Sequence, residues 1–238
     1  MDEKIKKKLI KNNEEISRLL RENETLFYEA GFRPPVKNFS LEKEEKINFP
    51  SGYIRTTGEF GRIFNLNEIV QSQHTKKNIA YALQLSDYYN FHLNRFYIWG
   101  SIKTMLYKHA LLNVVSVIEA LILECANNIN ANCKKCKKNG RCRNNICRSD
   151  RENMKNAAKK LNDLRILELS AKEFADLMVL YDYRNRIHIR ISEQNEFIDN
   201  KFNQELYNKA IKFLRIIDDQ LLQNGVPLYS TCKGFLSK

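Results

Sequence analysis

The stretch that decides the fold class is residues 98–128, IWGSIKTMLYKHALLNVVSVIEALILECANN. Apolar residues cover nearly the whole circumference of the helix it predicts, which is typical of the central helix of a bundle. Five residues interrupt the apolar run, so it is not an uncharged bilayer span of roughly 20 residues: Lys103, Lys108, His109, Glu119 and Glu124. Inside the run a carboxylate needs a partner. We therefore expect Glu119 to meet a cation, a hydroxyl or a backbone amide, unless it faces outward.

Amphipathic periodicity predicts helices around this one. One helix spans 1–31, another precedes the central helix within 66–131, and three more follow at 151–164, 170–191 and 203–223. Ser170 with Glu173 has the spacing of a capping box, which marks a helix start. The chain has only 8 Gly and 4 Pro, too few turn residues for a sandwich or barrel of many short strands. The predicted fold class is all-α.

The chain divides into an N-terminal helix (1–31), an irregular connector (32–65) and a helical domain (66–238) with a cysteine-rich insertion at 132–150. Within the connector, clustered Gly and Pro with scattered aromatic residues suggest a short hairpin around Tyr53–Phe64. The apolar residues of the first helix share one face. Asn12 and Asn23 lie on that face, so we favour a helix docked on its own domain over a short coiled coil.

The charge balance is basic: 40 Lys and Arg stand against 28 Asp and Glu, a formal charge of +12. This favours an anionic partner, with nucleic acid as the first candidate, although it also serves solubility alone. The first residues contain no secretory signal, so we expect a cytoplasmic protein without a membrane segment. In a reducing compartment the six cysteines act as thiols or metal ligands.

Four cysteines follow the pattern Cys133-x2-Cys136-x5-Cys142-x4-Cys147. Two residues between cysteines let both sulfurs reach one ion at ~2.3 Å, so the pattern predicts a structural zinc knuckle. An iron–sulfur cluster, free thiols or two disulfides are the alternatives. The same segment carries seven of the surplus positive charges and no acidic residue. These would bind phosphate or form a solvated basic loop: Lys134, Lys135, Lys137, Lys138, Arg141, Arg143 and Arg148.

Residues 181–190, YDYRNRIHIR, are the candidate active site. Arg184 and His188 are four apart and lie on one face of a helix. The guanidinium can hold a phosphodiester by paired hydrogen bonds, and the imidazole can move protons near neutral pH, without a metal. Asn185 adds a polar group beside them, while Arg186 and Arg190 add positive charge for RNA. In the structural alternative, this Arg or His pairs with Asp182 or Glu119.

Residues 96–224 resemble the HEPN superfamily, small all-α domains found in ribonuclease toxins, antiviral effectors and RNA-processing enzymes. The resemblance rests on ArgAsnArgIleHis at 184–188 and SerValIleGluAla at 116–120. The family motif has four to six residues between Arg and His, whereas this chain has three. The resemblance implies a homodimer in which two copies of Arg184 and His188 share a cleft. The cysteine-rich insertion is not part of the common pattern, and residues 1–95 have no counterpart.

The expected function is a metal-independent endoribonuclease, a toxin or antiviral effector in which Arg184, Asn185 and His188 are catalytic. A partner protein in the same defence or toxin–antitoxin system is the further expectation. The alternative is a non-catalytic module that reads RNA or DNA through the basic knuckle. The sequence contains no Gly-rich phosphate loop, Gly-x-Ser-x-Gly or His-Glu-x-x-His motif, so NTPases, α/β-hydrolases and metalloproteases lack support.

Overall fold

The computed structural model describes residues 2–31, 51–132, 153–185 and 201–225. These residues are mostly helical and contain no strand, which confirms the all-α class for the described part of the chain. Contacts divide the chain into two units, Met1–Pro50 and Ser51–Lys238. The first unit contributes one long helix, α1 (Glu3–Glu29), and the second contains a helical bundle.

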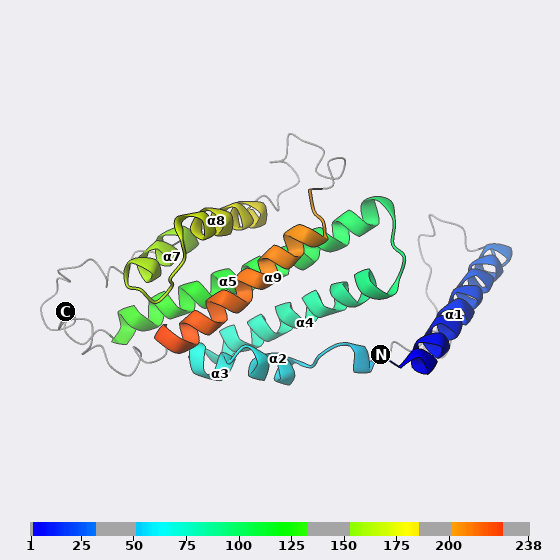
Figure 1. Ribbon diagram of the computed structural model, residues 1–238, viewed down its shortest axis with the longest axis horizontal. Coiled ribbons are helices and arrows are strands. Elements are labelled where there is room, and N and C mark those ends of the chain that lie inside the picture. Colours follow the sequence, from blue (N-terminus) through cyan, green and yellow to red (C-terminus); the bar gives the residue numbers. More distant parts are fainter. Residues whose placement is uncertain (1, 32–50, 133–152, 186–200, 226–238) are drawn as a thin grey trace, which may run out of the picture. The chain divides into compact units, whose positions relative to one another are not determined.

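Helix α5 (Gly100–Asn132) runs through the middle of the bundle (Figure 1). It contacts α4 (Gln73–Arg95), α7 (Met154–Asp163), α8 (Ala171–Asn185) and α9 (Gln204–Gln220). Side chains from several sides of α5 are therefore fully buried, as its apolar circumference predicted: Ala110, Val114, Val117, Ile118, Leu121 and Ile122.

Within the described residues, one helical stretch is long and apolar enough to cross a membrane, Gly100–Ile129 of α5. Most of its apolar window is buried by the other helices of the bundle. Such burial is what the core helix of a bundle requires, so length and composition alone are weak evidence for a membrane span.

Side-chain caps begin the surrounding helices close to the predicted positions. Ser170 and Glu173 form the expected reciprocal cap of α8: the Glu173 N–H donates to Ser170 Oγ at 3.3 Å, and the Ser170 N–H donates to Glu173 Oε2 at 3.0 Å. The Asn153 and Asn203 side chains accept from backbone amides in the first turns of α7 and α9. The predicted continuation of α8 beyond Asn185 lies outside the described residues.

The hairpin expected around Tyr53–Phe64 is wrong, because this segment is helical. It forms a 3-10 turn η2 (Ser51–Tyr53), then α2 (Thr57–Ile63), and α3 (Leu66–Ile69) follows. Thr56 and Glu59 make a complete capping box at the start of α2. Asn65, in the left-handed conformation with φ 44°, links α2 to α3.

The chain leaves α9 through the π-helical turn η3 (Leu221–Gly225). Gly225 is buried, and a Cβ atom added to it would lie 3.2 Å from Cys125 Sγ and 3.5 Å from Ile166 Cγ2. Close approach of α5 to this turn therefore favours a residue without a side chain, since an added Cβ would make a tight contact with Cys125.

Large apolar side chains remain exposed where α4 turns into α5. Tyr97 is 96% exposed and Trp99, the only tryptophan of the chain, is 76% exposed. The first turn of α5 is thus not covered by the bundle, and Ile102, expected on the buried circumference, is 61% exposed.

Candidate functional site

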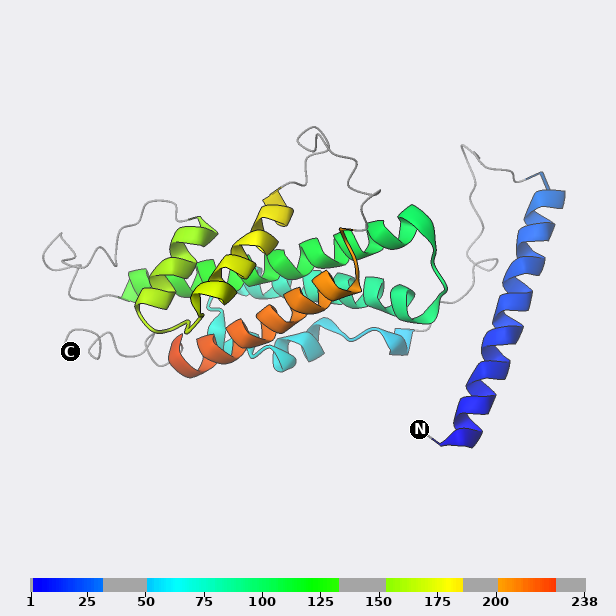
Figure 2. The same ribbon diagram turned by 45° about the horizontal axis from the view of Figure 1, so that its top comes forward.

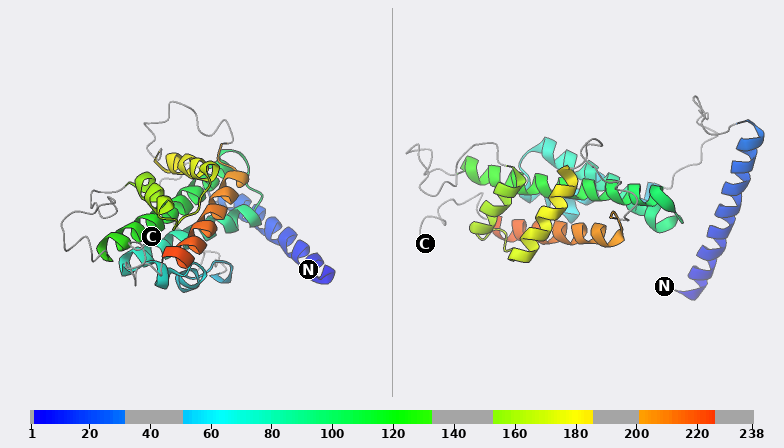
Figure 3. Two further views of the ribbon diagram at one scale, coloured as in Figure 1. Left: turned by 60° about the vertical axis from the view of Figure 1, so that its left-hand side comes forward. Right: turned by 90° about the horizontal axis from the view of Figure 1, so that it is seen from above.

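Arg184 and Asn185, the first two residues of the expected catalytic motif, lie in the last turn of α8. Helix α8 crosses α5 obliquely near the middle of α5 (Figures 2 and 3). The crossing brings this last turn next to Glu119, the carboxylate inside the apolar run of α5.

The Arg184 side chain is held at both terminal nitrogens. Its Nη2 atom lies 2.9 Å from Glu119 Oε2, and its Nη1 donates to Asn185 Oδ1 at 3.2 Å. Glu119 is largely covered, with 14% of its side chain exposed, whereas Arg184 is 34% exposed. The expectation that Glu119 meets a cation is confirmed. The same contact is the Arg184–Glu119 pairing that the sequence indicated as the structural alternative to a catalytic role.

A guanidinium has five N–H donors, and these two contacts use two of them. Arg184 Nε is buried and has no hydrogen-bond partner within the described residues. An arginine fixed by a carboxylate and still rich in donors is suited to hold an oxyanion such as a phosphate.

Aromatic and basic side chains lie beside this turn. The rings of Tyr183 and Phe202 pack edge to face with centroids 5.5 Å apart, and Lys108 Nζ lies 5.4 Å from the centre of the Phe202 ring. Tyr181 and Tyr183 are partly buried against the core. The observed contacts of both tyrosines are therefore packing contacts with the core.

The other predicted site residues lie outside the described part of the chain. These are His188, Arg186 and Arg190, the cysteines Cys133, Cys136, Cys142 and Cys147, and the basic residues 134–143. No three His, Cys, Asp or Glu side chains gather into a metal-binding group among the residues that are described. His109 stacks on Tyr89 with ring centroids 5.9 Å apart, so its contact is aromatic packing.

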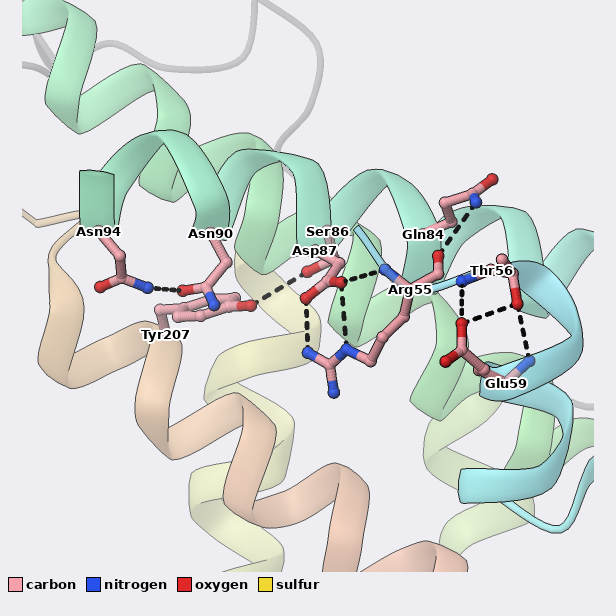
Figure 4. Close-up of polar contacts among 9 residues, drawn as sticks. All are labelled: Arg55, Thr56, Glu59, Gln84, Ser86, Asp87, Asn90, Asn94 and Tyr207. Carbon is pink, nitrogen blue, oxygen red and sulfur yellow. Dashed lines mark hydrogen bonds and ion pairs between the residues drawn. The ribbon is translucent and has the colours of Figure 1, made fainter. Parts of the chain in front are cut away.

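A second polar constellation, which the sequence did not reveal, connects the segment just before α2 with α4 and α9 (Figure 4). Asp87 of α4 accepts three hydrogen bonds from Arg55: from the backbone N at 2.9 Å, from Nε at 3.1 Å and from Nη2 at 2.5 Å. The Asp87 carboxylate raises the pKa of Arg55 through these hydrogen bonds. Beside it, the hydroxyls of Ser86 and Tyr207 lie 3.2 Å apart in the buried interface.

These residues line a cleft of about 470 Å³ that also reaches Asp218 of α9. Asp218 is 4% exposed, and its Oδ1 has no hydrogen-bond partner within the described residues. Burial raises the pKa of Asp218 to about 6, the Asn65 amide opposes this by donating to Oδ2 at 3.5 Å, and nearby Asp219 and Glu68 add to the increase. The sequence signal for Asp218 is a carboxylate on the apolar face of a helix, the same signal that marked Glu119.

A second hollow, of about 390 Å³, lies at the exposed turn between α4 and α5 and is lined by aromatic and aliphatic side chains, among them Tyr97 and Trp99, and by His92. Its lining includes no Asp, Glu, Lys or Arg side chain. Arg184 with Glu119 and Asn185 therefore remains the candidate functional site.

No protein-family model matches the chain, and no curated protein or solved structure matches it.

Proposed function

We propose that the protein is a metal-independent endoribonuclease of HEPN type, acting in the cytoplasm as a toxin or antiviral effector. The observation that supports the proposal best is the state of Arg184. Its guanidinium is held by Glu119 and Asn185 and retains unused donors, its side chain is one third exposed, and it lies four residues before His188 in the chain.

In the proposed mechanism, Arg184 binds the scissile phosphate and stabilises the charge that develops on the phosphorane. His188 takes the proton of the 2'-hydroxyl, which attacks phosphorus, and returns a proton to the departing 5'-oxygen. The products are a 2',3'-cyclic phosphate and a free 5'-hydroxyl. Asn185 orients the phosphate or the imidazole, and Arg186 and Arg190 attract the RNA backbone. Two copies of the chain contribute one motif each to a shared cleft.

Purified protein should cleave RNA in magnesium-free buffer. It should also cleave RNA when EDTA is added at the start of the assay and not before. His188→Ala should abolish cleavage, whereas His74→Ala, a substitution of an exposed histidine in the first turn of α4, should leave it unchanged. Circular dichroism of both variants checks that helicity is kept. Cleavage by the folded His188→Ala variant at the wild-type rate would falsify the proposal.

The ion pair with Glu119 also favours a second function, a non-catalytic module that binds nucleic acid. In this reading Arg184 is structural, and the basic segment 134–143 reads RNA or DNA around a zinc ion held by Cys133, Cys136, Cys142 and Cys147. Such binding should fall steeply with salt, should be lost in Cys136→Ser and should occur without cleavage. The buried Cys125→Ser variant is the matched control for the loss of a thiol outside the cluster.

A further inference from the structure

Helix α1 carries an exposed apolar stripe that has the spacing of a coiled-coil seam. The seam positions alternate at intervals of four and three, and they hold Ile5, Leu9, Asn12, Ile16, Leu19, Asn23 and Leu26. The five apolar residues are 37–54% exposed, and α1 contains no buried residue. An apolar seam over about three heptads is sufficient for pairing with another helix.

The charges of α1 specify which helix fits. Residues 2–11 carry five lysines (Lys4, Lys6, Lys7, Lys8 and Lys11) against the acidic Asp2 and Glu3. Residues 14–29 carry five glutamates (Glu14, Glu15, Glu22, Glu24 and Glu29) against two arginines. A second copy in the parallel direction would place lysine beside lysine, whereas an antiparallel copy places the basic N-terminal end of each α1 beside the acidic C-terminal end of the other.

The seam residues agree with the antiparallel direction in a single register. When Ile16 lies opposite Leu19 of the second copy, Leu9 lies opposite Leu26 and Asn12 lies opposite Asn23. Each asparagine then meets an amide that can both donate and accept, so neither is buried against an aliphatic side chain. A polar pair of this kind lowers stability but fixes the register.

The residues beside the seam are compatible with the same register. Lys8 comes to lie beside Glu29 of the second copy, twice by symmetry. Glu15 comes to lie beside Glu22, a like-charge contact. Arg18 already offsets this repulsion within α1, because it binds Glu15 at 2.8 Å and Glu22 at 2.9 Å.

We propose that α1 pairs antiparallel with α1 of a second copy of this chain, through the seam Ile5–Leu26. The pairing is independent of RNA cleavage, and it joins two chains whether or not their bundles also meet.

Zero-length crosslinking of the full chain tests the contact directly. An equal mixture of 14N- and 15N-labelled chains is treated with a carbodiimide, and crosslinked peptides are identified by mass spectrometry. The expected product is an amide between Lys8 and Glu29 in which one peptide is light and the other heavy.

Two pairs of variants test the seam and its direction by sedimentation equilibrium. Ile16→Glu should raise the dissociation constant roughly tenfold or more, because it places a charge in the seam. Ile10→Glu should not, since Ile10 is 49% exposed but lies off the seam. Lys8→Glu should weaken association, and Lys8→Glu combined with Glu29→Lys should restore it.

Three results would overturn the proposal. The first is crosslinks from α1 only to acidic residues of the same chain, which would place the stripe on its own bundle. The second is an equal effect of Ile16→Glu and Ile10→Glu on association. The third is failure of the charge exchange to restore what Lys8→Glu weakens, which would exclude the antiparallel direction.

Discussion

Arg184 Nη2 lies 2.9 Å from Glu119 Oε2, so the end of α8 is tied by an ion pair to the middle of α5. Because Glu119 is mostly buried and Arg184 is only partly so, loss of the arginine leaves a carboxylate in an apolar surrounding. Arg184→Ala and Glu119→Ala should therefore be coupled by about 1 kcal/mol in a double-mutant cycle. Urea denaturation followed by circular dichroism measures the four free energies of unfolding. Additive effects would show that the pair contributes nothing to the fold.

The Arg55–Asp87 pair should be more important for stability than its position near the surface suggests. The Asp87 side chain is 8% exposed while Arg55 is 50% exposed, so Arg55→Ala leaves a buried carboxylate with only the backbone donor of residue 55. We expect a loss of roughly 1–3 kcal/mol at pH 7. Arg62→Ala, an exposed arginine on α2, is the control and should cost a few tenths of a kcal/mol or less.

Asp218 should make stability fall as the pH rises through the acidic range. Burial raises its pKa from 3.8 to about 6 in the folded chain, so between these values the folded state binds the proton that the unfolded state has released. Stability from this group is therefore lost between about pH 4 and pH 6, and the full cost is present above it.

The neutral variant Asp218→Asn removes that dependence. Relative to the wild type, this variant should be stabilised at pH 7.5: the difference in free energy of unfolding should be on the order of 1–3 kcal/mol larger at pH 7.5 than at pH 4. Asp219→Asn changes the exposed neighbouring carboxylate and should show a much smaller difference. Equal pH profiles for the two variants would mean that net charge, not burial, is responsible.

Gly225 should resist replacement by alanine because α5 approaches it closely. The added Cβ would lie 3.2 Å from Cys125 Sγ, so Gly225→Ala should destabilise the chain by about 1–2 kcal/mol. Combining it with Cys125→Ala, which removes that sulfur, should cost less than the sum of the two single changes. Gly61→Ala on α2 has no atom within 4 Å of the new Cβ and should stabilise by about 0.5–1 kcal/mol.

The helices of the bundle could be predicted because each carries its own signal. The apolar circumference of α5, the Ser170–Glu173 cap and the periodicity of α9 are local properties of a few turns. The segment 53–64 is helical although Gly58 and Gly61 are typical of a turn. Thr56 and Glu59, three residues apart, are the local signal for this helix, because they form its capping box.

The candidate site could be predicted only in part. The position of Glu119 in an apolar run showed that it needed a cation, but the identity of that cation depends on how α8 crosses α5, which no local pattern determines. The same holds for Asp87, whose partner Arg55 lies outside any helix, and for Asp218 beside Asn65. Contacts between elements far apart in the chain depend on how the helices cross and pack. The local patterns of a single sequence do not show this packing.

The position of Trp99 determines how this protein can be studied by spectroscopy. It is the only indole of the chain and is 76% exposed in the native state, so its emission already comes from a largely aqueous surrounding. Unfolding of the bundle should shift that emission little. An emission wavelength that stays constant during denaturation would therefore not mean that the protein is stable. The same exposure makes Trp99 a sensitive reporter of any molecule that covers the turn between α4 and α5, since its spectrum would move to shorter wavelength on contact.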